Sequence, residues 1–197
     1  GLNLILVQIS KHAVTAYGLY YKIQQFILFA AFGLRDAITP IVSFGYGMGS
    51  RERVKLGIKY GMLYTLIIMA AGLVLLEIFA QPFAALFGLS GETEQLCVSA
   101  MRVISLSFIF AGANVAFQGI FQALESGVQS LVISVCRQIL FVLPVAWGFS
   151  LIVRNSGSTD MMWLVWLTFL IAEGLSAVIA VILMTGISRR RISTLGN

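Results

Sequence analysis

Six ionisable side chains lie inside long apolar stretches of this sequence, and they are the residues best placed to do chemistry. An ionisable group in the hydrocarbon core of a bilayer is destabilising by about 3 kcal/mol or more unless it is paired or hydrated, so each one is a functional hypothesis. Glu173 lies near the middle of the last apolar stretch, where its carboxyl could take up and release a proton. Glu173 is therefore the first candidate for ion coupling, and Asp36 is the second. The set is Arg35, Asp36, Glu77, Arg102, Arg137 and Glu173.

A structural role competes with coupling for these residues. Glu173 could instead form an ion pair with Arg137 or Arg102 that holds two helices together without titrating. Arg35 and Asp36 are neighbours in the chain, and on a helix they point about 100° apart. We therefore expect that they do not neutralise each other in place and that one of them faces a hydrated cavity.

Uncharged polar residues form a second pattern, at spacings of seven, four and four residues. Such spacing places them along one face of a helix, and that face is too polar for lipid. It could line a hydrated cavity, or it could join helices by hydrogen bonds. With Gln24 from an earlier stretch, the candidates for a cavity wall are Gln24, Ser107, Asn114, Gln118 and Gln122.

The composition indicates which kind of secondary structure positions these side chains. Hydrophobic residues make up 59% of the chain and charged residues only 11%, with a mean hydropathy of +0.94. Soluble domains carry about a quarter charged residues, so the solvent for most of this chain is lipid. A membrane-spanning helix needs about 20 mostly apolar residues. Five stretches meet that length, at 16–45, 57–80, 95–122, 128–153 and 161–187, which predicts an all-α, polytopic transmembrane bundle.

The opening run, residues 1–9, is apolar but too short to span a membrane, and it lacks the basic flank and cleavage site of a signal peptide. We expect it to be a truncated helix, and the chain to be a fragment of a longer protein. The segment 81–89 suggests a short amphipathic helix on the outer surface.

The basic residues give an orientation, because short cytoplasmic loops hold an excess of Lys and Arg. Five alternating spans place the cluster 51–59 on the same side as the tail arginines 189–191, which predicts that this side is cytoplasmic. The net charge of +5 is not gathered into one stripe with interleaved aromatic residues, so nucleic acid is not the expected partner. We expect a multi-pass protein of the cell membrane, in particular the bacterial inner membrane.

Enzymatic and metal chemistry find no support in the sequence. Two cysteines, Cys97 and Cys136, and the single His12 make neither a disulfide framework nor a set of metal ligands. The turn 45–50 does not have the glycine spacing of a nucleotide-binding loop. Since no set of nucleophile, base and acid is recognisable either, we expect neither an enzyme nor a cofactor.

Four stretches resemble the second half of a multidrug and toxic compound extrusion (MATE) transporter. They run from Ala13 to Gly61, from Ala100 to Ile104, from Gln118 to Gly127 (QGIFQALESG) and from Ile133 to Trp147 (ISVCRQILFVLPVAW). The positions that carry the resemblance are Tyr17, Gly18, Gln24, Phe32, Gly33, Pro40, Tyr46, Gly47, Gly49, Arg53, Lys55, Gly61, Arg102, Gly119, Gln122, Arg137 and Pro144.

The resemblance implies twelve helices in two six-helix lobes around a central cavity that opens to each side in turn. This chain would supply helices seven to twelve, the first truncated, and its partner would be the missing N-terminal lobe. The implied activity is export of organic cations or amphipathic drugs in exchange for H⁺ or Na⁺. One branch of the family places coupling acids in helices seven and ten, but the corresponding part of helix ten, residues 107–114, carries no carboxylate. A lipid-linked oligosaccharide flippase of the same superfamily and a non-transporting membrane scaffold are the alternatives.

Overall fold

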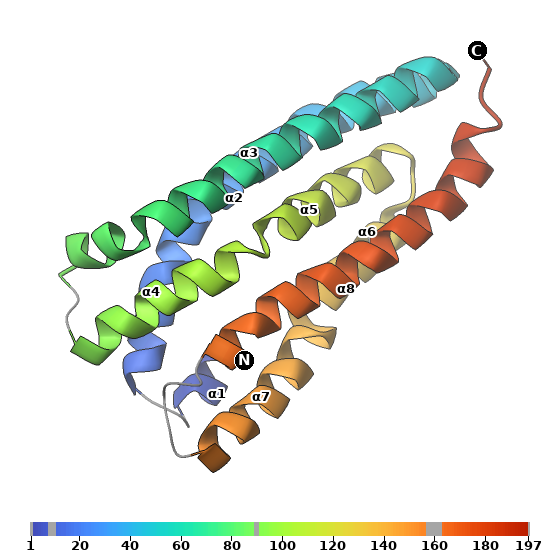
Figure 1. Cartoon of the computed structure of the whole chain (residues 1–197). Helices are drawn as coiled ribbons and strands as arrows, with labels where there is room; N and C mark the ends of the chain where they lie inside the picture. Colours follow the sequence, from blue (N-terminus) through green and yellow to red (C-terminus); the bar gives the residue numbers. More distant parts are fainter. Residues whose placement is uncertain (1, 8–10, 89–90, 157–162, 197) are drawn as a thin grey trace.

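The computed structural model describes residues 2–7, 11–88, 91–156 and 163–196, and these residues are almost entirely helical (Figure 1). Their only β-type pairing is one isolated bridge between Ser50 and Gly196. The α-helices are α1 (Leu2–Val7), α2 (Lys11–Gly47), α3 (Arg51–Leu86), α4 (Gly91–Ser105), α5 (Phe108–Ala123), α6 (Gly127–Val135), α7 (Val142–Ser156) and α8 (Trp163–Ile187), and the π-helical segments are η1 (Cys136–Leu140) and η3 (Ser188–Ile192).

Helices α2 and α3 form a long antiparallel pair, and both extend beyond the expected limits of 16–45 and 57–80. The turn between them uses Gly49 at φ +71°, a left-handed conformation that suits glycine, and Ser50 caps α3 by accepting from the backbone N–H of Arg53. The pair packs closely because Gly61 has no side chain. A Cβ atom built at Gly61 would lie 2.6 Å from Cγ1 of Ile38.

Helix α3 is kinked at Phe79, so its last turns form a short helix at an angle to the rest (Figure 1). Phe79 has non-helical dihedral angles (φ −104°, ψ 15°), three residues before Pro82. Proline lacks the N–H for its helical hydrogen bond and clashes with the preceding turn, which accounts for the bend. The amphipathic segment expected at 81–89 is thus the last part of α3 up to Leu86, and residue 89 lies outside the described residues.

The third expected span, 95–122, is a broken helix. Helices α4 and α5 are bent by 52° at Leu106 and Ser107, and together they pass for one span. The hydroxyl of Ser107 donates to the carbonyl oxygen of Ile104 at 2.6 Å, and the hydroxyl of Ser105 donates to Glu77 at 2.9 Å. The hydroxyl of Ser105 also lies 3.0 Å from the carbonyl oxygen of Arg102, so serine side chains bond to carbonyl groups of the last turn before the break.

The fourth expected span, 128–153, contains a π-helical turn. Helix α6 passes through η1 into α7, and Pro144 lies in the first turn of α7, where its missing N–H is tolerated. The fifth, 161–187, is α8 continued by η3 to Ile192, and its expected start at residue 161 lies outside the described residues.

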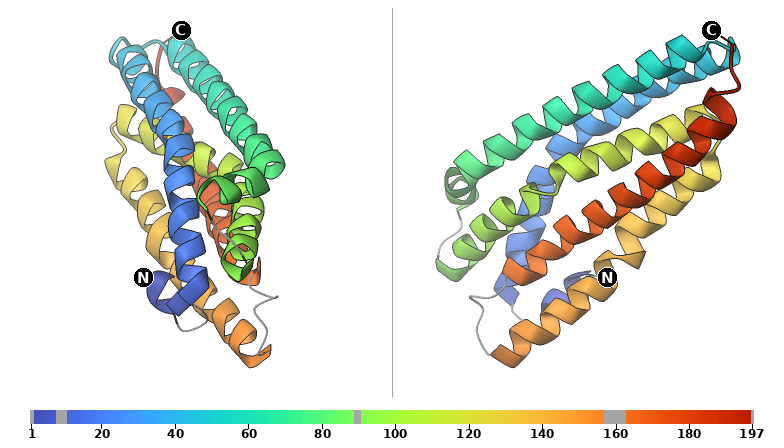
Figure 2. Two further views of the ribbon diagram at one scale, coloured as in Figure 1. Left: turned by 90° about the vertical axis from the view of Figure 1, so that its left-hand side faces the viewer. Right: turned by 45° about the vertical axis from the view of Figure 1, so that its right-hand side comes forward.

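The helices lie side by side in a tilted bundle (Figures 1 and 2). The pair α2 and α3 lies on one side, α4 and α5 come next, then α8, and α6 and α7 lie on the far side. Within the described residues, four helices are long and apolar enough to cross a membrane, or five if the bent pair counts as one span. This agrees with the predicted all-α transmembrane bundle.

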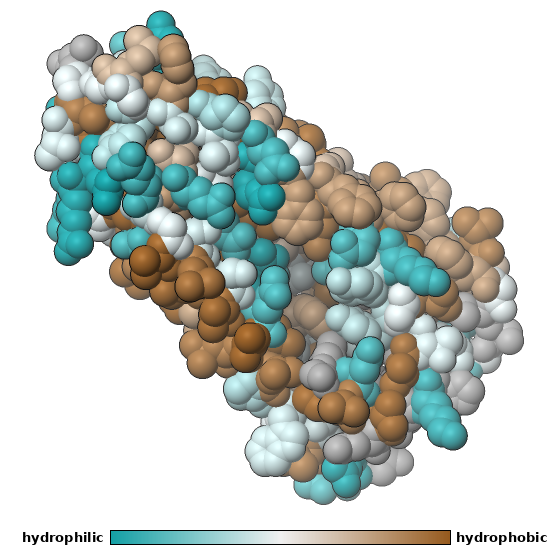
Figure 3. All heavy atoms as spheres, turned by 180° about the vertical axis from the view of Figure 1, so that it is seen from behind, coloured by the Kyte–Doolittle hydropathy of each residue, from teal (hydrophilic) through white to brown (hydrophobic). Residues whose placement is uncertain are grey.

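Basic residues gather at one end of the bundle, as the orientation argument requires. Arg51, at the start of α3, donates from one guanidinium nitrogen to the carbonyl oxygens of Ser193 and Leu195, at 2.9 Å each, and from its backbone N–H to that of Gly196 at 2.8 Å. In Figure 3, hydrophilic atoms collect at this end, at the left, while hydrophobic atoms cover much of the middle. The turn at 47–50 and the tail after α8 therefore lie at the same end of the bundle, the end that the distribution of basic residues predicts to be cytoplasmic.

Candidate functional site

A buried ion pair lies in the middle of the bundle. Arg137 in η1 donates from Nε to Oε2 of Glu173 in α8 at 2.8 Å and from Nη2 to Oε1 at 2.9 Å. Asn114 in α5 adds a hydrogen bond from Nδ2 to Oε2 of Glu173 at 2.7 Å and another to its backbone oxygen at 3.0 Å. The carboxylate thus receives a bidentate guanidinium and an amide, and it joins three segments of the chain.

Local backbone geometry brings Arg137 to this position. A π-helical turn holds one more residue per turn than the α-helix around it, so it rotates the following side chains and is frequent at functional sites. Arg137 is the second residue of η1. The segment ends just before α7, whose Pro144 cannot donate to the carbonyl four residues earlier, so the α-helical ladder is already weakened there.

Burial makes this pair a strong local interaction. The side chains of Arg137 and Glu173 are only 10% and 14% exposed. Separating two such charges would leave one of them in a poorly hydrated place, which is destabilising by several kcal/mol. Of the two partners expected for Glu173, the structure shows Arg137. Arg102 is exposed and borders a different hollow, beside Glu94 and Gln95.

A cavity of about 750 Å³ opens next to the pair, between α2 on one side and η1, α7 and α8 on the other. Helix α2 contributes a continuous stripe to its wall. The stripe consists of Tyr17, Tyr21, Gln24, Gln25, Leu28, Phe32 and Arg35. Gln118, Arg137, Gln138, Phe169 and Glu173 are among the residues of the other walls.

Aromatic rings form the wall at the end of the cavity farthest from the basic end of the bundle. The ring of Tyr17 stacks on Trp166 at a centroid distance of 6.0 Å and on Phe169 at 5.7 Å, and it lies 6.2 Å from the ring of Tyr21. Packed rings with fixed orientations offer flat apolar faces to a ligand, and amide side chains beside them offer hydrogen bonds. The cavity thus combines aromatic, amide and paired ionic groups.

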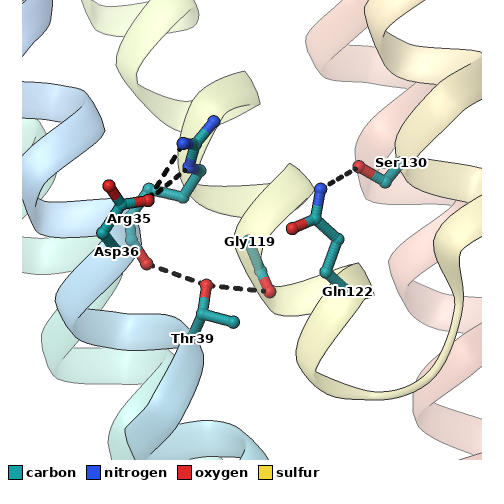
Figure 4. A network of polar contacts seen from close by, with 6 residues as sticks. All are labelled: Arg35, Asp36, Thr39, Gly119, Gln122 and Ser130. Carbon is teal, nitrogen blue, oxygen red and sulfur yellow. Dashed lines mark hydrogen bonds and ion pairs between the residues drawn. The ribbon is translucent and has the colours of Figure 1, made fainter.

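The expectation that Arg35 and Asp36 do not neutralise each other was wrong, although Arg35 does line the cavity. Figure 4 shows the guanidinium of Arg35 turned back on its neighbour, with Nε and Nη2 lying 3.1 and 2.9 Å from Oδ1 of Asp36. Adjacent Cα–Cβ bonds do diverge on a helix, but the long arginine side chain curls around the helix surface and closes the gap. Arg35 also lies over the ring of Phe32, with Cζ 5.2 Å from the centroid. Asp36 is exposed and does not line the cavity.

The polar residues expected to share one face have three different environments. Gln118 lies in the cavity wall, with its Nε2 buried and without a hydrogen-bond partner in the described part of the chain. Asn114 is buried and bound to Glu173, and Ser107 is buried at the break before α5. Gln122 is exposed and donates to the hydroxyl of Ser130 at 3.2 Å, across the turn between α5 and α6 (Figure 4). Only Gln24, Gln118 and Glu173 of the candidates therefore meet in the cavity.

The sequence reasoning missed the aromatic part of this wall. Positions 17, 21, 24, 28, 32 and 35 follow each other at spacings of four, three, four, four and three, which is one face of a helix. Tyrosines, an amide and a cation on one face of an apolar helix are the signal that could have revealed it. Among residues 2–7, 11–88, 91–156 and 163–196, no group of three or more His, Cys, Asp or Glu side chains is placed to hold a metal ion.

A bundle of apolar helices with a polar cavity and a buried ion pair in its middle defines a multi-pass membrane protein of the transporter type. The MatE family model matches residues 2–147, which is most of the chain. The chain therefore belongs to the MatE family, and the resemblance drawn from the sequence is confirmed.

Individual relatives agree with this family. The chain is 25% identical over 142 residues to a protein of Shewanella oneidensis named FAD transporter, covering 72% of this chain and 31% of that one. It is 23% identical over 191 residues to the multidrug export protein MepA of Staphylococcus haemolyticus, covering 96% of this chain and 40% of that one. These relatives are transporters of bacteria, and the chain spans less than half of their length.

Solved structures share the fold. A multidrug resistance MATE family transporter of the MOP superfamily in an outward-facing conformation matches with a TM-score of 0.83 and 18% identity, over 95% of this chain and 42% of that one. One in an inward-facing conformation gives the same TM-score and identity, over 96% and 44%. A MOP superfamily transporter from Pyrococcus furiosus, described as having a binding pocket of reverse polarity, gives 0.80 and 20%, over 98% and 41%. The described bundle thus has the fold of one part of a MATE transporter.

Proposed function

We propose that this chain is the C-terminal lobe of a secondary active exporter that expels organic cations or amphipathic drugs in exchange for H⁺ or Na⁺. The cavity beside α2 carries the proposal. Its volume of about 750 Å³ lies within the range of about 300–1,000 Å³ that is usual for small-molecule sites. Its aromatic and amide walls suit amphipathic molecules of several shapes. The name of the staphylococcal relative, which matches nearly the whole chain, supports multidrug export.

The charges around the cavity favour cationic or neutral substrates over anionic ones. A fixed cation in the wall would repel a cationic drug, and two arginines line this wall. Each of them has a carboxylate partner, however, since Arg137 is paired with Glu173 and Arg35 with Asp36. The guanidinium charges are thus balanced in place.

The pairing of Arg137 with Glu173 also links uptake of the coupling ion to release of the drug. When Glu173 takes up a proton, or when Na⁺ binds its carboxylate, the charge of Arg137 is no longer compensated. The cavity then becomes more positive, and a bound organic cation is destabilised. Uptake of the coupling ion and loss of the drug would therefore be linked with the sign that an antiporter requires.

Alternating access requires a lobe that keeps its internal fold while it moves against its partner lobe. The equal TM-scores to an outward-facing and an inward-facing transporter support such a lobe. The partner would be the N-terminal lobe of the same protein, which would complete the pathway through the membrane.

An anionic substrate is the main alternative. A lipid-linked oligosaccharide flippase would handle a pyrophosphate, and the Shewanella relative is named for FAD, which also carries phosphates. Such a substrate would need arginines without partners in the cavity wall. The pairing of Arg35 and Arg137 weighs against this alternative.

The decisive experiment measures drug export from vesicles that contain the intact protein, driven separately by a pH gradient and by a Na⁺ gradient. Glu173→Gln removes the carboxylate and should abolish export by whichever gradient drives the native protein. It should also weaken the binding of an organic cation, because Arg137 then lacks its counter-charge. Asp36→Asn tests the second coupling candidate, and Glu52→Gln is the matched control, because it makes the same change as Glu173→Gln at an exposed position outside the cavity. The control should leave export nearly intact. Unchanged export by Glu173→Gln would remove Glu173 from coupling, and loss of export by Asp36→Asn alone would transfer the role to Asp36.

Accessibility separates a transporter from a membrane scaffold. After Cys97 and Cys136 are replaced, cysteines at Gln24 and Gln118 should react with a water-soluble thiol reagent, because both positions line the cavity. A cysteine at buried Asn114 should react much more slowly. If neither cavity position reacts, the cavity is closed to water and the scaffold alternative gains support.

A further inference from the structure

A second hollow lies on the other face of the α2 and α3 pair, away from the ion pair. It is a groove of about 690 Å³, and its walls are almost entirely apolar. Gly57 and Gly61 of α3 let the helices approach closely along the groove, since a Cβ at Gly57 would lie 3.2 Å from Cγ2 of Val42. Its sides are formed by Leu34, Ala37, Ile41, Phe44, Tyr60 and Tyr64.

The length and depth of the groove match one leaflet of a bilayer. Along α2 it runs from Leu34 to Phe44, which at 1.5 Å per residue is about 15 Å. The hydrocarbon core of a bilayer is about 30 Å thick, so the groove covers about half of it. The end of the groove at Phe44 lies just before the turn at 47–50, on the side that the basic residues predict to be cytoplasmic. On this orientation the groove lies in the cytoplasmic leaflet.

A positively charged side chain, that of Arg53, lies at the end of the groove nearest the lipid headgroups. Arg53 lines the groove beside Gly45, where a Cβ would lie 3.1 Å from the Cβ of Arg53. The guanidinium of Arg53 is exposed and, within the described ranges, has no carboxylate partner. Arg51, two residues earlier, is by contrast bound to the tail carbonyls.

We infer that this groove binds one acyl chain of an anionic phospholipid of the cytoplasmic leaflet, with its phosphate at Arg53. An apolar channel one leaflet deep fits the chain, and an unpaired arginine at the level of the headgroups fits the phosphate, which guanidinium binds through two parallel hydrogen bonds. Pro40 lies in the wall, and its ring adds a rigid apolar surface without a backbone donor.

The test compares spin-labelled phosphatidylglycerol with spin-labelled phosphatidylcholine, using the intact protein in phosphatidylcholine vesicles. Phosphatidylglycerol should occupy the motionally restricted, protein-bound population preferentially. One cation near the membrane surface changes the affinity for an anionic lipid about fivefold. Arg53→Gln should reduce the preference by about that factor. Lys55→Gln is the matched control, since Lys55 is exposed in the same basic segment but does not line the groove.

A second pair of variants tests the groove itself. Ala37→Phe places a ring in the groove and should remove the restricted lipid, whereas Ala71→Phe, on an exposed face of α3 outside the groove, should not. Equal binding of both lipids by the native protein would overturn the inference. An equal effect of Arg53→Gln and Lys55→Gln would overturn it too, because the preference would then come from general surface charge. Efficient crosslinking of a cysteine at position 37 to the other lobe would show that protein, and not lipid, covers the groove.

Discussion

Two arginine–carboxylate pairs of almost equal length occupy very different places in this lobe. Arg137 and Glu173 approach to 2.8 Å with side chains 10% and 14% exposed, while Arg35 and Asp36 approach to 2.9 Å with side chains 28% and 69% exposed. The first pair joins η1 to α8 and is bound by Asn114 of α5. The second joins two neighbours on α2 and adds no link between helices.

The comparison teaches that distance alone does not measure an ion pair. A pair open to water contributes about 0–1 kcal/mol, because water competes for both charges. Loss of one partner of a buried pair is destabilising by about 3–5 kcal/mol, because the remaining charge has no water to replace it. We therefore expect the loss of one partner to cost severalfold more stability in the buried pair than in the exposed one.

The largest effect should come from Arg137→Gln. It leaves the carboxylate of Glu173 buried beside Asn114 without a counter-charge, and we expect the free energy of unfolding to fall by about 3 kcal/mol. Unfolding in mixed micelles of SDS and a mild detergent would measure it. Arg35→Gln is the matched control and should cost less than about 1 kcal/mol. Equal losses would refute the comparison.

A double substitution should sharpen this result. Arg137→Met with Glu173→Leu removes both charges, and apolar side chains often replace a buried pair at little cost to stability. We expect the double variant to be more stable than Arg137→Met alone, with a coupling energy of about 2 kcal/mol in the double-mutant cycle. Additive losses would show that the two side chains do not act as a pair.

An intermediate effect is expected for Asn114→Ala. Its amide donates to the carboxylate and to the backbone oxygen of Glu173, and a hydrogen bond to a charged group contributes about 1.5–3 kcal/mol. We expect a loss of about 2 kcal/mol by the same unfolding measurement. Gln122→Ala removes a hydrogen bond at the exposed turn and should lower the free energy of unfolding by less. A larger loss for Gln122→Ala than for Asn114→Ala would contradict the role of Asn114 in stabilising the buried pair.

The smallest effect should come from Asp36→Asn. The exposed carboxyl is replaced by an amide of the same shape, and the thermal midpoint of unfolding should stay within the error of the measurement. A marked loss of stability would show that Asp36 is shielded from water in the intact protein.

The sequence revealed the apolar spans, because a run of about 20 apolar residues has few alternatives in a membrane protein. It did not reveal how the spans are interrupted. The break at Leu106 and Ser107 carries no proline or glycine, so nothing in the local pattern announces it. The π-helical turn at Arg137 had a signal in Pro144, but a proline alone does not distinguish a kink from an added residue.

Contacts between side chains were the harder part of the site. The pairing of Glu173 with Arg137 was among the alternatives, because both are charged and lie deep in their spans. The choice between Arg137 and Arg102 depends on helix rotation, which the sequence does not fix. Arg35 was misjudged because the argument used the directions of the Cα–Cβ bonds, and a side chain as long as arginine does not keep to that direction.

The hydrogen bonds between Arg51 and the tail after α8 also limit where the lobe can bend. They join the turn between α2 and α3 to the segment after α8, so segments more than 140 residues apart in sequence are held together at this end of the bundle. Among the described residues, no comparable fastening of a turn to a tail occurs at the opposite end. Bending within the lobe should therefore begin away from this end, at the kink of α3 at Phe79 and at the break between α4 and α5 midway along their span.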